Sequence, residues 1–462
     1  TFNVTIDMPE GTALERTDRV ARRVGDVLRE HPEVTSYEPT VGMSGVVDFN
    51  GLLRGNSLKE GEHVGAVRVN LTNKHHRDIS SIEIVRNLRP KLDAIGERFD
   101  ANIKLVEDPP GPPVRATILA EVYGPDYDKV REIARELRTE VFEKTEDVVD
   151  IDTSVSADTR EYDIRVNREK AALAGIMPAE VAQTLHAFLD GRDIGTIHMD
   201  TAQEPVPIHV QIPTEARVDV DDLEDIFFTN EQGRQIPLTE IATIEEQPTP
   251  KPIQHRNQRP VAYVTGELGS TSQVYAVLKM WDYLGNNPLP SGVKLDQYFM
   301  AAPDTTGYSI RWDGEMRLTL DVFRDLGSAF AVAIILIYLV LVGYYGSFMV
   351  PIIVMGAIPL TMVGVFPGHW AMGQHFTATS MIGVIALAGI VVRNSLLLID
   401  FILDNRRAGE GLFEAVLHAG IARLRPIMLT ALALIIATSV ILTDPVFGGL
   451  AIGGGISLIL RG

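Results

Sequence analysis

The sequence has 462 residues, and its 61 acidic against 42 basic side chains give a formal net charge of −19. This acidity argues against a nucleic-acid binder, which needs a basic surface, and the length predicts two or more domains. The sequence contains no cysteine, which excludes disulfides and thiolate metal sites.

The first part of the chain shows one order of strands and helices twice. Residues 4–8 alternate in polarity like a strand, and residues 14–30 have the spacing of an amphipathic helix. The same order returns after the stiff linker Pro109–Pro113. Its second helix, 272–284, and its last strand, 293–299, follow only after a long insertion rich in Pro, Gly and Asp. The sequence therefore predicts two ferredoxin-like βαββαβ units, the second of them interrupted.

The last 138 residues differ in composition from the rest. They contain six arginines, six acids and no lysine, and the 67 residues between Asp325 and Arg393 carry no charge. Such a stretch is too long for one buried helix, and it fits membrane spans of roughly 20 residues each. We expect five spans, at residues 326–342, 348–366, 377–403, 426–442 and 445–460.

Both ends of the sequence suggest that it is an interior or C-terminal piece of a longer membrane protein. The chain begins at Thr1 without a leader, and the fifth predicted span ends while it is still apolar. The predicted fold class is thus an α+β membrane protein with two soluble subdomains, an insertion in the second, and a bundle of transmembrane helices. The predicted bounds are 1–109 for the first subdomain, 110–164 with 261–314 for the second, 165–260 for the insertion, 315–325 for a linking helix and 326–462 for the spans.

Orientation in the membrane follows from the arginines. The connection between the third and fourth spans holds Arg406, Arg407, Arg423 and Arg425, whereas the neighbouring loops hold no Lys or Arg. By the positive-inside rule this connection is cytoplasmic. Counting spans backwards places the acidic soluble part on the periplasmic side.

Four stretches of the sequence, in chain order, resemble one family of transporters. GIVVRNSLLLIDF at 389–401 is similar to the tenth span of resistance-nodulation-division (RND) exporters, and RLRPIMLT at 423–430 is similar to the eleventh. IDMPEGT at 6–12 resembles the start of their second periplasmic loop, and Gly346-Ser347 resembles their eighth-to-ninth connection. The resemblance covers essentially the whole chain and fits the hydrophobe/amphiphile exporter branch best.

This resemblance implies the C-terminal half of a proton-driven pump of the bacterial inner membrane. It implies two porter subdomains, an inserted docking subdomain, spans eight to twelve, and a homotrimer that works with a periplasmic adaptor and an outer-membrane channel. The implied partners are amphiphilic small molecules and membrane lipid, with no cofactor, no metal site, no nucleic acid and no enzymatic activity. The sequence has no HExxH, Walker A, GxGxxG or GxSxG motif, so pumping must draw on an ion gradient.

The candidate proton-relay residues lie on the third and fourth predicted spans. Arg393 is in the middle of its span, where a guanidinium costs several kcal/mol unless it is paired inside the bundle or snorkels to the surface. Asp400 is close to the cytoplasmic end, so we expect the acidic partner outside this sequence. By resemblance, Arg423 and Thr430 also belong to the relay, and Asn394 bridges helices. The alternatives are a topological anchor for Arg423 and a hydroxyl bonded to its own helix for Thr430.

The candidate substrate site is the segment Gly42–Asn56, which contains several glycines. Its apolar side chains, which we expect to contact substrate, include Met43, Val46, Phe49 and Leu52. By resemblance the segment is the substrate-gating loop. Exposed apolar side chains cost solubility, and the binding of a ligand is one reason to keep them. The alternative is a loop that packs on its own subdomain.

Three hypotheses for the function follow. The first is the export of hydrophobic or amphiphilic compounds from the periplasm or the outer leaflet. The second is a metal-ion pump, which predicts methionine clusters, although Met8, Met43, Met177 and Met199 are scattered in the sequence. The third is a lipid-handling or protein-translocation relative.

Overall fold

The computed structural model describes residues 1–46, 49–54, 59–107, 114–199, 201, 205–213, 220–223, 226–269, 271–300, 306–442, 444 and 447–456. The chain forms two compact units, residues 1–156 with 253–462 and residues 157–252. The bounds predicted from the sequence for the five domains stay a prediction.

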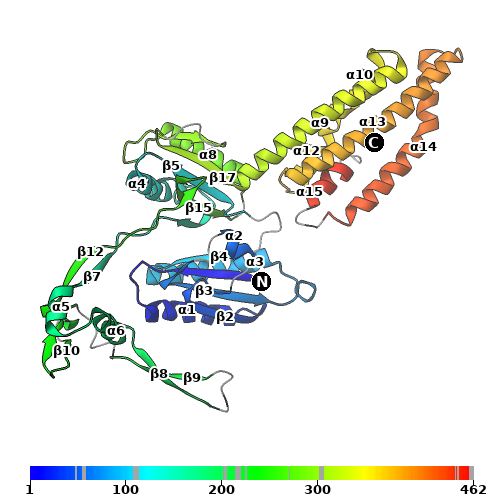
Figure 1. The fold of residues 1–462 in the computed structure, drawn as a ribbon. Coiled ribbons are helices and arrows are strands. Elements are labelled where there is room, and N and C mark those ends of the chain that lie inside the picture. The colour runs from blue at the N-terminus through cyan, green and yellow to red at the C-terminus, as the bar shows by residue number, and fades with distance from the viewer. Residues whose placement is uncertain are drawn as a thin grey trace. The chain divides into compact units, whose positions relative to one another are not determined.

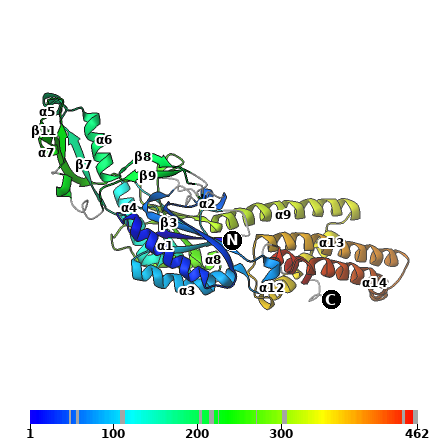
Figure 2. The same ribbon diagram turned by 90° about the horizontal axis from the view of Figure 1, so that it is seen from below.

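The first subdomain, residues 1–107, is an antiparallel sheet with two helices on one face (Figures 1 and 2). Its elements are β1 (Phe2–Asp7), α1 (Leu14–Arg29), β2 (Val34–Met43), α2 (Phe49–Arg54), β3 (Glu60–Leu71), η2 (Lys74–His76), α3 (Ser81–Phe99) and β4 (Asn102–Glu107). The sheet order β2-β3-β1-β4 is that of a βαββαβ unit. Alternate residues of β1 are buried against α1 and α3, as the period of two predicts, and α3 starts at a capping box between Ser80 and Glu83.

The second subdomain, residues 114–156 with 253–314, has a sheet of order β16-β17-β5-β15-β6. Its elements are β5 (Ile118–Tyr123), α4 (Tyr127–Leu137), η3 (Arg138–Phe142), β6 (Val148–Thr153), β13 (His255–Arg256), β14 (Arg259–Pro260), β15 (Ala262–Leu268), α8 (Gln273–Asn286), β16 (Asp296–Tyr298) and β17 (Ser309–Gly314). The core beneath α4 and α8 surrounds Phe142 and Trp312, whose rings stack with centroids 6.2 Å apart.

One strand of this sheet differs from the prediction. The sequence predicts residues 293–299 as the last strand of the unit, but β17 takes that place and pairs with β5, while β16 is a short edge strand parallel to β17. Arg311 and Asp313 interrupt the apolar pattern of β17, which is nevertheless buried along its whole length. Charged side chains in a buried strand have no periodic signature, because ion pairing replaces apolar packing.

The unit of residues 157–252 has its own small core. Its elements are β7 (Arg160–Val166), α5 (Arg168–Ala174), α6 (Pro178–Leu189), β8 (Arg192–Ile197), β9 (Val206–Val210), η5 (Val220–Leu223), β10 (Phe227–Thr229), β11 (Gln235–Pro237), α7 (Leu238–Ile241) and β12 (Ala242–Pro248). Strands β7 and β12 pair antiparallel over seven residues, from Ala242 opposite Val166 to Pro248 opposite Arg160. The β8–β9 hairpin is exposed along both strands.

Four helical segments among the described residues are long and apolar enough to cross a membrane: Glu315–Tyr345, Met349–Ala371, Ala378–Arg407 and Leu412–Ser439. The helices are α9 (Glu315–Tyr345), α10 (Met349–Met355), α11 (Ala357–Leu360), α12 (Met362–Ala371), α13 (Ala378–Arg407), α14 (Leu412–Ser439), α15 (Gly448–Ala451) and the π-helical turn η6 (Ile452–Ile456). Helices α13 and α14 run side by side (Figures 1 and 2).

The structure differs from the predicted spans at three points. Helix α9 is continuous, so the predicted linking helix 315–325 and the first span are one helix. Helix α14 begins at Leu412 and contains Pro426, which the prediction placed at its start; membrane helices tolerate an internal proline. Of the fifth predicted span, 445–460, the structure describes 447–456, which hold α15 and η6; the rest lies outside the described residues.

Candidate functional site

Arg393 lies on α13 with its side chain exposed. Within the described part of the chain it forms no ion pair. Asp400, two turns further along α13, instead accepts a hydrogen bond from the Tyr345 hydroxyl of α9 at 2.6 Å. The structure therefore ties Asp400 to α9, and the role of Arg393 in proton transfer stays a prediction.

The other candidate relay residues lie on α13 and on its neighbour α14. Asn394 follows Arg393 on α13 and is partly buried, and Arg423 and Thr430 lie on α14, which packs against α13. The Arg423 guanidinium lies over the Phe401 ring, 5.6 Å from its centroid, and among the described residues its buried Nε has no hydrogen-bond partner. The Thr430 hydroxyl donates to its own helix, with Pro426 O at 3.1 Å and Ile427 O at 2.9 Å. Thr430 therefore has the geometry of the alternative interpretation, in which its hydroxyl bonds its own helix.

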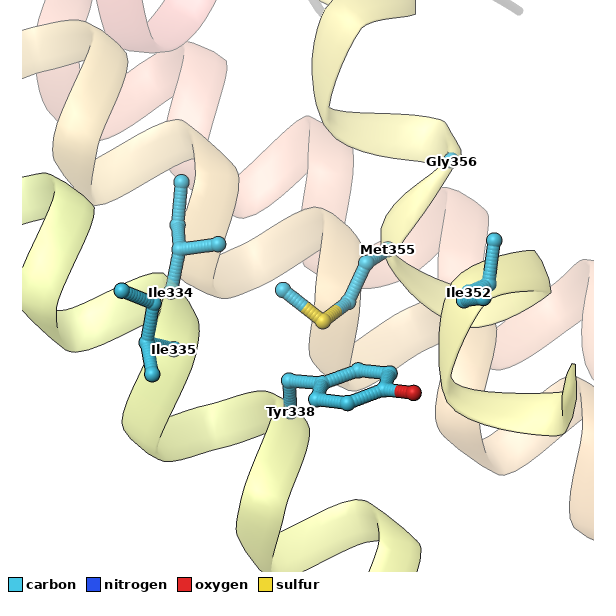
Figure 3. Close-up of a pocket in the computed structure, with 6 residues that line it drawn as sticks. All are labelled: Ile334, Ile335, Tyr338, Ile352, Met355 and Gly356. Atoms are coloured by element: carbon cyan, nitrogen blue, oxygen red, sulfur yellow. The ribbon is translucent and has the colours of Figure 1, made fainter. Parts of the chain in front are cut away.

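A pocket of about 370 Å³ lies between α9 and α10. Figure 3 shows side chains of α9 on one side of the space and side chains of α10 on the other. The lining residues are Ile334, Ile335, Tyr338, Ile352, Met355 and Gly356. The one hydroxyl, on Tyr338, already donates to Phe348 O at 3.2 Å. The pocket therefore offers apolar contact to whatever enters it.

The candidate substrate loop lies between β2 and β3 and contains a short helix that the sequence did not predict. Met43 ends β2, Phe49 begins α2, and the side chains of Met43, Val46 and Leu52 are 54%, 50% and 51% exposed. The Phe49 side chain lies outside the described part. These three described side chains are thus exposed, and their contact with substrate stays a prediction.

An acidic residue of the second subdomain lies against the end of this loop. Arg54, which ends α2, donates from Nη1 to Glu267 Oε1 at 2.5 Å, and Glu267 also accepts from the Thr117 hydroxyl. Burial raises the pKa of Glu107 at the end of β4, although the guanidinium groups of Arg89 and Arg86 lower it. An ion pair therefore connects the loop to the second subdomain.

A second ionic cluster joins the two subdomains, and the sequence did not reveal it. Lys104 of β4 lies 2.5 Å from Asp7 Oδ2 of β1 and 2.5 Å from Asp152 Oδ2 of β6, and Lys59 Nζ bonds the same two oxygens at 2.8 and 2.9 Å. Burial alone would raise the pKa of both carboxyls, but the two ammonium groups lower it.

A fork-shaped pair lies next to this cluster. Arg89 of α3 donates two hydrogen bonds of 2.7 Å to the two oxygens of Asp150. A bidentate pair fixes orientation as well as distance. Together with Lys104 and Asp152, it holds the two subdomains in one arrangement.

A third charged cluster lies inside the second subdomain. Glu121 of β5 is fully buried and accepts from Arg311 Nε at 2.6 Å, from the Tyr123 hydroxyl at 2.7 Å and from Arg256. Asp313 accepts from Arg311 at 3.1 Å and pairs with Arg256 at 2.9 Å. Burial raises the pKa of Glu121. These pairs explain how β17 is buried with its charged side chains.

Taken together, the described helices and sheets define a membrane protein with an α+β part outside the spans. Residues 1–438 match the sequence pattern of the AcrB/AcrD/AcrF family. The chain belongs to this family of RND transporters.

The names of individual relatives indicate different functions. The chain is 27% identical over 317 residues to the swarming motility protein SwrC of Bacillus subtilis. The aligned region covers 68% of this chain and 28% of the relative. It is 24% identical over 324 residues to the cobalt-zinc-cadmium resistance protein CzcA of Cupriavidus metallidurans (69% of this chain, 29% of the relative). It is 26% identical over 421 residues to the multidrug resistance protein MdtC of Pectobacterium carotovorum (88% and 37%).

A solved structure shares the fold. The crystal structure of a heavy metal efflux pump superposes with a TM-score of 0.75 at 17% sequence identity, covering 99% of this chain and 45% of that chain. The chain thus spans less than half the length of each of these proteins.

Proposed function

We propose that the protein containing this chain is a proton-driven exporter of hydrophobic or amphiphilic compounds in the bacterial inner membrane, with its acidic soluble part in the periplasm. The observation that carries the proposal is the candidate substrate loop, with Met43, Val46 and Leu52 about half exposed. Such side chains cost solubility unless they meet an apolar ligand.

The electrostatics around the loop favour substrates with a cationic head. Glu267, Glu107 and the first residue of α9, Glu315, lie in the same region, where Arg54 pairs with Glu267 and the charges of Arg86 and Arg89 act on Glu107. A compound with an apolar body and a positive head would match both the exposed loop and the acidic residues.

The coupling to protons rests on Arg393. Its guanidinium stays protonated, so it can supply a fixed field to an ionised carboxylate but cannot carry the proton itself. Protonation of that carboxylate, from the rest of the protein, would release the pair and let the helices repack. By family, we also propose a homotrimer that works with a periplasmic adaptor and an outer-membrane channel.

The second candidate function is metal-ion export, favoured by the likeness to CzcA. Within the described residues, no group of three or more His, Asp or Glu side chains is arranged to hold a metal ion. Met8 is buried in the first core and Met43 is exposed. The geometry of the loop therefore favours the amphiphile.

The test compares two substitutions in the full-length protein. Leu52→Asp introduces a charge on the loop, and Leu278→Asp introduces one on α8, where the leucine is 48% exposed. In cells that depend on this exporter, Leu52→Asp should lower resistance to cationic amphiphiles at least about tenfold, a loss of roughly 1.4 kcal/mol in transport. Leu278→Asp should leave resistance unchanged. Unchanged amphiphile resistance with lost zinc or cobalt resistance would replace the proposal by metal export.

A further inference from the structure

His369 of α12 is a buried titratable group inside the membrane bundle, with 4% of its surface exposed. Its Nδ1 lies 2.9 Å from Val365 O of its own helix, and its Nε2 lies 2.8 Å from Ser380 Oγ of α13. A carbonyl oxygen only accepts, so Nδ1 carries the hydrogen. In the neutral ring the Nε2 lone pair therefore accepts from the Ser380 hydroxyl.

Hydroxyl groups lead from this imidazole to the surface. Ser380 is fully buried, and its Oγ lies 3.3 Å from the Oγ1 of Thr377, an exposed residue. Thr377 Oγ1 in turn lies 2.9 Å from Thr379 Oγ1. Each hydroxyl can donate or accept, because its hydrogen rotates. The three side chains therefore form a hydrogen-bonded path on which a proton can enter or leave the ring.

Helix α15 covers this path closely. A Cβ placed on Gly449 would lie 2.4 Å from Ser380 Oγ and 3.0 Å from Thr377 Oγ1, and a Cβ on Gly453 would lie 2.9 Å from Ser380 O. Only glycine lets the backbone of α15 and η6 approach so near. The backbone of α15 and η6 thus covers the buried part of the path at Ser380, and movement of α15 would change the access of solvent to Ser380.

The surroundings of His369 are apolar. The Phe376 ring is 5.4 Å from the imidazole and also contacts Phe323 of α9. On α13 the first charged residue is Arg393, 13 positions beyond Ser380, or about 20 Å along the helix. The described residues of α15 and η6 carry no charge, and on α9 Arg324 pairs with Asp325 next to Phe323. Within the described residues, no charged side chain is bonded to His369.

We propose that His369 is a proton-binding site of the transport cycle, loaded through Thr377 and Ser380 and covered by Gly449. A hydronium ion gives its proton to Thr377 Oγ1, which passes its own proton to Ser380 Oγ, which passes its own to Nε2; the products are water and imidazolium. The imidazolium then donates to Ser380 Oγ, whose new hydrogen lies on the side of Thr377. A buried charge without a counter-ion favours a more solvated arrangement, so proton binding favours displacement of α15. The inference rests on the proposed proton-driven export.

The test uses the full-length protein in lipid nanodiscs, with histidine labelled by ¹⁵N. The His369 signal is the one lost in His369→Gln. It should report hydrogen on Nδ1 at high pH and protonation of Nε2 as the pH is lowered. Ser380→Ala should slow exchange of the Nε2 proton at least about tenfold, because the path loses a hydroxyl. A signal that stays neutral at every pH measured would overturn the proposal.

Transport provides the second measurement. His369→Gln should lower transport driven by a pH gradient at least about tenfold, roughly 1.4 kcal/mol. His375→Gln, six positions away at an exposed residue, is the matched control and should keep wild-type transport. Equal transport by the two variants would also overturn the proposal. Wild-type protein that transports without any pH gradient would refute proton-driven export, while the titration still tests the site itself.

Discussion

Replacing Lys104 by methionine tests whether the ionic cluster holds the two subdomains together. The Lys104 side chain is 6% exposed and pairs with Asp7 of its own subdomain and Asp152 of the other. Lys59 contacts the same carboxylates but is 34% exposed. Methionine keeps most of the volume of lysine and removes the charge. The variant therefore leaves two largely buried carboxylates with one half-solvated ammonium group.

The expected loss is large because burial removes the solvent that would otherwise stabilise the carboxylates. Removing one partner of a buried ion pair costs about 3–5 kcal/mol. The soluble part of this unit is of a size at which 1 kcal/mol shifts the melting temperature by about 2–4 °C, so Lys104→Met should lower it by about 6–20 °C. Thermal unfolding of the full-length protein, followed through Trp281 and Trp312 in the second subdomain, measures this shift.

The pH dependence gives an independent check. The pKa values of Asp7 and Asp152 lie below the ordinary range, so their stabilisation is present above about pH 4 and is lost as the pH falls through the lowered values. Burial would lower the pKa of Lys104, but the two carboxylates raise it. The stabilisation that Lys104 contributes to the folded state is therefore fully present at any pH below the ordinary lysine pKa. Lys104→Met should flatten the loss of stability on acidification.

An exposed ion pair of the same subdomain serves as the control. Arg22 and Asp18 pair at 2.7 Å on α1, with side chains 76% and 42% exposed. Such pairs contribute about 0–1 kcal/mol, so Arg22→Met should shift the melting temperature little. Equal shifts for Lys104→Met and Arg22→Met would show that the buried cluster is effectively solvated, and the reasoning would fail.

Two further predictions concern single charges. Arg393→Ala should abolish efflux by the full-length protein while expression and assembly persist, and Arg393→Lys should keep part of it, because the charge remains but the planar donor fork is lost; wild-type efflux from the alanine variant at matched expression would remove Arg393 from the mechanism. Glu107→Gln should raise the melting temperature at pH 8 but not at pH 4. The raised pKa of Glu107 means that its ionisation costs folding free energy above the ordinary carboxyl range, and glutamine removes that cost; a decrease at pH 8 would contradict this.

Much of the fold could be predicted because the first subdomain obeys local periodicity. Val4 and Ile6 alternate with polar residues in β1, and α1 places Val20, Val24 and Leu28 on one buried face. These patterns depend on neighbours within a few residues, so they can be recognised in the sequence. Strand β17 does not obey the pattern, because its charged residues form ion pairs; Arg311 binds Glu121, which is 190 positions away in the chain, and Asp313 pairs with Arg256.

The same distance in sequence explains which site residues were missed. Lys104 and Asp7 are 97 positions apart, and each is a single charge in an otherwise strand-like stretch. A charge that alternates with apolar residues normally faces water, so the sequence alone favours a solvated side chain. Asp150 and Asp152 gave a weak signal. They are two positions apart on β6, so both carboxylates lie on one face of the strand and need cationic partners there. His369 carried no signal, because its partner Ser380 lies beyond a turn on the next span.

Helix α9 gives the bundle and the second sheet a continuous connection. Strand β17 ends at Gly314, whose φ of +77° and close approach to Ala116 O and Thr117 O exclude a side chain. The helix starts at the next residue and runs 31 residues, about 46 Å, to Tyr345. There the Tyr345 hydroxyl binds Asp400 on α13, the helix that also carries Arg393. Helix α9 therefore joins β17 to this hydrogen bond on α13 without an intervening loop. A link of this kind is what a charge change in the spans needs in order to alter the soluble subdomains.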